Sequence, residues 1–98
     1  MLKFKDLEFK AHLFDEIDPT AIQAIINFDN GYGVSVVRGK YFFYCNDNTY
    51  EVAILKDGNL CYDTPIASDV LGYQTKDQIT KIMKELQTYK KDDKNTTK

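Results

Sequence analysis

The chain has 98 residues, 43% hydrophobic and 13% aromatic, and its 13 Lys/Arg and 15 Asp/Glu give a formal net charge of −2. This length predicts one globular domain over residues 1–90, this composition is too apolar for a disordered chain, and the near-neutral charge disfavours nucleic acid as a partner because phosphates attract many cations. No apolar run approaches the ~20 residues of a membrane span, and no secretory signal opens the chain, so we expect a cytoplasmic protein without a membrane partner.

The first predicted element is a strand over residues 7–13, in which apolar side chains alternate at period two. A hairpin follows, with strands over 21–28 and 34–39 joined by the turn signal Asn30-Gly31. Residues 20–28 also fit a helical stripe. The turn directly after them and their Ile/Phe/Asn content favour the strand.

The aromatic stretch 40–48 either extends the preceding strand around a bulge at Gly39 or forms an aromatic loop. A second hairpin covers 50–56 and 59–63, with Asp57-Gly58 as its tight turn. A two-residue loop pairs Leu55 with Leu60, whereas a bulged turn would shift this register by one. Both faces of this hairpin are apolar, which places it inside a sheet.

The last element is a helix over 75–90 that opens on a capping box formed by Thr75 and Gln78. Its apolar residues share one helical face. They are Ile79, Ile82, Met83, Leu86 and Tyr89. Residues 91–98 carry no apolar side chain, which predicts a disordered polar tail. The expected fold class is α+β: an antiparallel meander of four or five strands with the C-terminal helix packed on one face.

Reactive groups are sparse. His12, Cys45 and Cys61 are the candidate metal ligands, but they lack the close ligand pairs of structural zinc, so we expect no metal and two free thiols. No Ser or Cys lies in a recognisable nucleophile motif, and no two carboxylates have a spacing that indicates a general acid–base pair. These observations predict a protein that is not an enzyme and holds no cofactor.

Aromatic side chains are unusually frequent, with seven Tyr and six Phe. A core this small cannot enclose every ring, and exposed rings anchor protein interfaces because little side-chain entropy is lost when they are ordered. The alternative is that about half of these rings belong to the core. The predicted partner-binding residues are Tyr32, Tyr41, Phe42, Phe43, Tyr44, Asp47 and Tyr50.

Charge is divided along the chain. Residues 21–75 carry three basic and six acidic side chains, whereas residues 76–98 carry seven Lys and four acidic ones. The acidic middle could resemble nucleic acid electrostatically and occupy a basic groove of another protein.

Four segments carry a likeness to known sequences: DNGYGVSVV at 29–37, YEVAILKDG at 50–58, LCYDTPI at 60–66 and DVLGY at 69–73. With the terminal helix they resemble a family of small proteins carried by phages and prophages of low-GC bacteria. The resemblance implies a compact accessory protein made in the host cytoplasm. Small accessory phage proteins frequently block host defence, and anti-CRISPR proteins are a prominent class.

These observations together predict a phage-encoded, protein-binding inhibitor of a host defence system, anti-CRISPR-like, that occludes or locks a nucleic-acid-handling effector. The expected partner is a host protein, with Cas effectors among the candidates. One alternative is a small metal-dependent or enzymatic protein that uses His12, Cys45 and Cys61. Another is a sheet-based binder of single-stranded nucleic acid. An open meander also leaves two sheet edges through which a homodimer could form.

Overall fold

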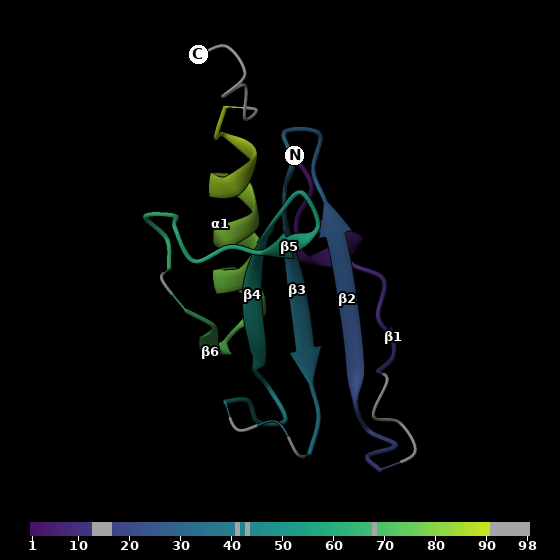
Figure 1. The fold of residues 1–98 in the computed structure, drawn as a ribbon. Coiled ribbons are helices and arrows are strands. Elements are labelled where there is room, and N and C mark those ends of the chain that lie inside the picture. The colour runs from purple at the N-terminus through teal and green to yellow at the C-terminus, as the bar shows by residue number, and fades with distance from the viewer. Residues whose placement is uncertain (13–16, 41, 43, 68, 91–98) are drawn as a thin grey trace.

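An antiparallel sheet and one C-terminal helix make up the fold in a computed structural model that describes residues 1–12, 17–40, 42, 44–67 and 69–90 (Figure 1). The strands follow the order β1-β2-β3-β4-β5, and β6 also pairs with β4. The predicted α+β class and meander are therefore confirmed. The predicted tail, 91–98, lies outside the described residues.

The first hairpin consists of β2 (Ile22–Asn27) and β3 (Tyr32–Arg38), paired from Ile22↔Arg38 to Asn27↔Gly33. The strand prediction for this segment is confirmed, and the helical alternative is wrong. Gly31 in the turn has a φ of +92°, a conformation that glycine adopts without steric cost. The strand β3 ends at Arg38, and the described residues of the aromatic stretch, 40, 42 and 44–48, lie outside any strand.

The second hairpin consists of β4 (Tyr50–Lys56) and β5 (Asn59–Leu60). Leu55 pairs with Leu60, as the two-residue turn predicts. β5 is shorter than the predicted strand 59–63. The Cys61 N–H still donates to the Ile54 carbonyl at 2.8 Å, but the expected Ala53–Tyr62 pair does not form. β4 lies inside the sheet, between β3 and the edge formed by β5 and β6.

The N-terminal segment differs from its prediction. A 3₁₀ helix, η1 (Phe4–Asp6), precedes a two-residue β1 (Lys10–Ala11), where one strand over 7–13 was expected. Phe4, Leu7 and Phe9 pack against the core instead of pairing with β2. Their apolar alternation therefore reflects packing over the end of the core.

The strand β6 (Leu71–Gln74) has no counterpart among the predicted elements. It pairs with β4 through Tyr50↔Gln74 and Val52↔Leu71, and the register shifts between these pairs. The shift places a bulge at Gly72 and Tyr73. A bulge breaks the period-two pattern by which a strand is recognised in a sequence.

The helix α1 (Lys76–Gln87) begins with the predicted capping box: Thr75 Oγ1 accepts from the Gln78 N–H at 3.2 Å, and the Thr75 N–H donates to Gln78 Oε1 at 2.8 Å. The helix ends three residues before the predicted end at residue 90. Tyr89 lies beyond it but still packs against the core.

The core lies between α1 and one face of the sheet. Val34 and Val36 of β3 pair with Ile54 and Val52 of β4, and all four side chains are buried on that face. Each such side chain contributes roughly 1.5–3 kcal/mol of burial free energy. The helix covers them with Ile79, Ile82, Met83 and Leu86.

Candidate functional site

Tyr50 was predicted to bind a partner, but it belongs to the core, with 4% of its surface exposed. Its ring centroid lies 5.3 Å from that of Phe4 and 5.5 Å from that of Phe9, and the Arg38 guanidinium lies 4.6 Å from its centre. The ring is buried because β4 is an interior strand and Tyr50 shares the α1 side of it with Val52. Tyr50 therefore holds the N-terminal segment against the sheet.

Two further predicted rings are half-buried. Tyr32 meets Tyr89 edge-on, with ring centroids 5.2 Å apart, and the Lys56 ammonium lies 5.2 Å from the centre of the Tyr32 ring. Phe42 packs edge-on against His12 at 5.2 Å. Both rings are thus engaged within the fold. Tyr41 and Phe43, the other two members of the aromatic run, lie outside the described residues.

The candidate metal ligands are not brought together. The Cys45 thiol points to the Gly39 carbonyl at 3.5 Å, whereas the Cys61 N–H bonds to Ile54 near the other end of β4. Because Val37 pairs with Glu51, Gly39 and Ile54 are separated by about five strand residues, or ~17 Å. Within the described part of the chain, no three His, Cys, Asp or Glu side chains are grouped as ion ligands.

Among the predicted rings that the structure describes, Tyr44 is the most exposed, with 56% of its surface accessible. Beside it lies Tyr73 of β6, 53% exposed, which the sequence analysis did not single out. The Tyr73 N–H donates to the Tyr44 carbonyl at 2.7 Å. The two exposed tyrosines are therefore fixed to each other through the backbone.

The bulge in β6 sets this geometry. Gly72 lies so close to Tyr44 that a Cβ atom at Gly72 would be 2.6 Å from the Tyr44 Cβ. Tyr73 has a φ of +54°, in the left-handed region that bulky L residues avoid. The glycine thus serves close approach, and the tyrosine carries the backbone strain. The only sequence signal for this arrangement is the glycine that precedes Tyr73.

The Glu51 carboxylate binds the backbone of Tyr44. Glu51 Oε2 accepts the Tyr44 N–H at 2.9 Å, and Gln74 Nε2 donates to the Gly72 carbonyl at 2.9 Å. These bonds connect the 39–49 loop, β4 and β6. The tyrosine pair, defined here as Tyr44 and Tyr73, is therefore mounted on the sheet and not on a free loop.

The tyrosine pair borders an acidic segment. Residues 57–75 contain Asp57, Asp63 and Asp69 and no Lys, Arg or His, and all three aspartates are exposed. Leu60 and Tyr62 of the same segment are 58% and 42% exposed. The strands β5 and β6 both pair with β4, and Figure 1 shows β5 near the upper end of β4 and β6 near its lower end, beside the start of α1. This acidic edge, residues 57–75, combines negative charge with exposed apolar and aromatic side chains.

The opposite charge gathers on α1 and the N-terminal segment. Residues 76–90 carry four Lys and two acidic side chains, and Lys81 and Lys84 are exposed on the helix. The Lys76 ammonium lies 5.7 Å from the centre of the Phe4 ring, which brings η1 next to the helix. The chain therefore changes from acidic over residues 57–75 to basic over residues 76–90. Asp47, the acidic member of the predicted partner-binding set, is exposed in the 39–49 loop.

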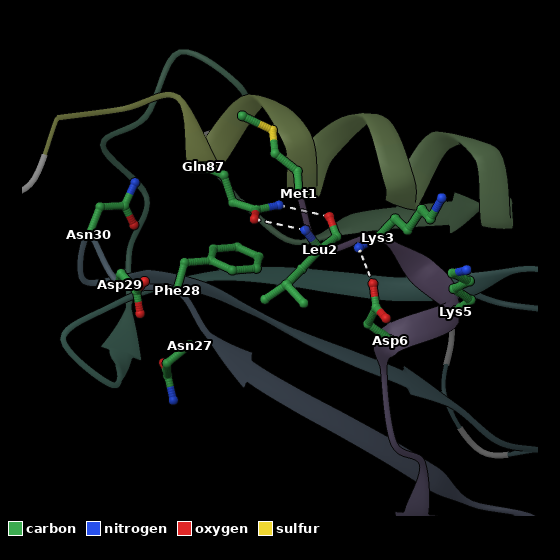
Figure 2. Close-up of a pocket in the computed structure, with 10 residues that line it drawn as sticks. All are labelled: Met1, Leu2, Lys3, Lys5, Asp6, Asn27, Phe28, Asp29, Asn30 and Gln87. Atoms are coloured by element: carbon green, nitrogen blue, oxygen red, sulfur yellow. Dashed lines mark hydrogen bonds between the residues drawn. The ribbon is translucent and has the colours of Figure 1, made fainter.

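A surface depression of about 690 Å³ lies between the N-terminal segment, the β2–β3 turn and the end of α1 (Figure 2). Gln87 spans it: its Oε1 accepts the Leu2 N–H at 3.0 Å, and its Nε2 donates to the Leu2 carbonyl at 2.8 Å. Figure 2 shows Leu2 beside the ring of Phe28 below these bonds. We assign this depression to the docking of the N-terminal segment on the helix.

Comparisons with protein-family models, with curated proteins and with solved structures found no match to this chain. Among the described residues, no helix combines the length and the apolar character needed to cross a membrane. The acidic edge and the tyrosine pair are therefore the candidate functional site.

Proposed function

We propose that the protein acts by binding a basic surface of another protein through its acidic edge. The observation that carries this proposal is the coincidence of three exposed aspartates with exposed Leu60 and Tyr62 in one segment that lacks any cation. Exposed rings supply buried area in an interface, and the negative charge selects a positive partner and speeds the encounter.

A basic groove that normally holds nucleic acid is the partner that this surface fits best. Such grooves are lined with Lys and Arg spaced to meet phosphates. An acidic protein edge can occupy the same cations, and rings in the edge can take the place of stacked bases. Binding of this kind excludes nucleic acid by direct competition.

Within this class we propose an inhibitor of a host defence effector, anti-CRISPR-like, made by a phage in the host cytoplasm. The support is the resemblance of residues 29–37, 50–58, 60–66 and 69–73 to small phage proteins, together with the partner chemistry derived above. A Cas effector carries a basic channel for guide and target, and occlusion of that channel would stop target binding.

The test uses a bacterial strain with an active CRISPR system and a phage that this system targets. Expression of the wild-type protein should restore plaque formation. The variant with Asp57→Asn, Asp63→Asn and Asp69→Asn should lose this protection. Asparagine keeps an acceptor oxygen at each position and tolerates the φ of +54° at Asp57, so the variant should fold.

The matched control is Lys81→Gln with Lys84→Gln on α1, which changes charge outside the acidic edge and should leave protection intact. In vitro, the wild-type protein should block target DNA binding when it is added to the purified effector first, and should fail when DNA is bound first. Absence of protection by the wild-type protein, or full protection by the triple Asn variant, would contradict the proposal.

A further inference from the structure

The geometry of the β6 bulge points to a second element of recognition, and we propose that the tyrosine pair with the Glu51 carboxylate binds an arginine side chain of the partner. This inference rests on the proposed function, because it names the group on the basic partner that the site takes. Its observations are two exposed rings, a strained backbone at Tyr73, and a carboxylate bonded to the Tyr44 N–H; of these residues, only Tyr73 lies within the acidic edge.

The backbone of Tyr73 is in a strained conformation. A φ of +54° suits glycine, and a tyrosine there costs stability unless its ring is useful. The ring is 53% exposed, so only part of it is covered within the fold. Gly72, one residue earlier, is used for the contact with Tyr44 and not to relieve this strain. A bulge of this kind re-aims a side chain, and here it presents a ring at the surface.

The backbone that carries the Tyr44 ring is held rigidly. Tyr44 is held on both sides, because its N–H donates to Glu51 and its carbonyl accepts from Tyr73. A ring fixed through its backbone loses less entropy on binding than a ring on a free loop. Such rings are the usual anchors of protein interfaces.

Arginine is the partner side chain that fits two tyrosine rings and a carboxylate. A guanidinium is planar, stacks on tyrosine faces and offers five N–H donors to a carboxylate. The Tyr44 N–H occupies one acceptor position of the Glu51 carboxylate, which has about four. The same combination occurs inside this fold, where the Arg38 guanidinium lies 4.6 Å from the centre of the Tyr50 ring. Lysine lacks the planar fork and should bind less well.

The experiment measures binding of fluorescent nona-arginine and nona-lysine peptides to the full chain by anisotropy. The wild-type protein should prefer the arginine peptide. Tyr73→Gly should weaken arginine binding by about fivefold or more while the melting temperature stays the same or rises. Tyr44→Ala should weaken it similarly, since alanine keeps the Cβ that contacts Gly72. Tyr73→Phe should bind normally because it retains the ring.

The matched control is Tyr62→Ala, which removes an exposed ring of the acidic edge away from the bulge and should change arginine binding less than twofold. The inference is overturned if Tyr73→Gly binds as the wild-type protein does, if Tyr62→Ala is equally harmful, if the two peptides bind equally, or if Tyr73→Gly lowers the melting temperature. Its failure is distinct from failure of the proposed function. Phage protection that survives Tyr73→Gly and Tyr44→Ala refutes the arginine site alone, whereas arginine binding without protection refutes the inhibitor alone.

Discussion

Asn30 closes the end of α1: its side-chain Nδ2 donates to the Leu86 carbonyl at 2.8 Å. The same nitrogen reaches the Tyr89 carbonyl at 2.9 Å, and the Asn30 Oδ1 accepts the Tyr32 N–H at 3.1 Å. One hairpin-turn residue therefore bonds to carbonyls at and just beyond the C-terminal end of the helix, where the N–H donors of a following helical turn are lacking. It joins the β2–β3 turn to the helix across the top of the core.

Asn30→Ala should consequently destabilise the protein more than an ordinary turn substitution. Loss of these bonds should lower the free energy of unfolding by about 1–2 kcal/mol, and the melting temperature by roughly 4–8 °C per kcal/mol. Thermal unfolding followed by circular dichroism measures the change. Asn59→Ala in the other hairpin is the control, because the Asn59 amide makes only a 3.5 Å contact with the Asp57 carbonyl. Equal effects of the two substitutions would contradict the capping role.

Truncation of Tyr50 should destabilise the protein far more than truncation of Tyr44. Tyr50→Ala removes a buried ring that packs on Phe4 and Phe9, and should cost about 3–5 kcal/mol of unfolding free energy. Tyr44→Ala removes an exposed ring and should change stability by less than about 0.5 kcal/mol. Urea denaturation compares the two variants. A stable Tyr50→Ala protein would show that the ring is not part of the core.

Stability should decline at high pH through Tyr89. Burial raises the pKa of the Tyr89 hydroxyl above its ordinary value of 10.0, and the charge of Glu85 and the bond to it act in the same direction. A folded-state pKa above the unfolded one means that this contribution is present below pH 10 and is lost as the pH rises through the folded value. Between about pH 9.5 and 11.5, Tyr89→Phe should lose less stability than the wild-type protein.

The measurement for Tyr89 is the urea midpoint at several pH values. Glu85→Gln should flatten the profile in the same way, since it removes the neighbouring charge and weakens the hydrogen bond. The control is Tyr62→Phe, an exposed tyrosine of the acidic edge, which should follow the wild-type profile. A Tyr89→Phe profile identical to that of the wild-type protein would contradict the assignment.

Chelators should have no effect on the fold. The Cys45 thiol bonds to the Gly39 carbonyl, whereas Cys61 is held by its N–H to Ile54, about five strand residues further along the sheet, so the two cysteines are too far apart to share one ion. We expect an unchanged melting temperature in EDTA and less than about 0.1 metal ion per chain by elemental analysis, since a structural zinc site would contribute folding energy outright. A melting temperature that falls in EDTA and recovers with zinc would refute this prediction.

The elements that the sequence predicts well are those whose signals are local. The capping box at Thr75, the Asp57-Gly58 turn and the alternation in β2 each involve a few adjacent residues, and each is found in the structure. β6 escaped prediction because its bulge breaks the alternation and because its partner, β4, is distant in the chain. η1 escaped because Phe4 and Leu7 pack on the core without strand pairing.

In the candidate site, too, local sequence signals predict some residues, whereas features that depend on distant segments are not predicted. The aromatic run gave Tyr44, since four adjacent rings cannot all be buried. Tyr50, which follows that run, is buried, and its burial depends on the N-terminal segment folding back over β4, which no local sequence signal predicts. Tyr73 could not be found, since its exposure comes from a positive φ that a tyrosine rarely adopts. Strain of this kind is a property of the assembled sheet and not of a short segment.

Residues 57–75 carry three aspartates and no cation, whereas residues 76–90 carry four Lys and two acidic side chains. Under the proposed function, the aspartates of the acidic edge attract a cationic groove while the two proteins are still apart. Association should therefore slow markedly as salt is added, even though the net charge is only −2. Under the proposed function, in which the protein competes with nucleic acid for one groove, a fast encounter is as useful as affinity after contact.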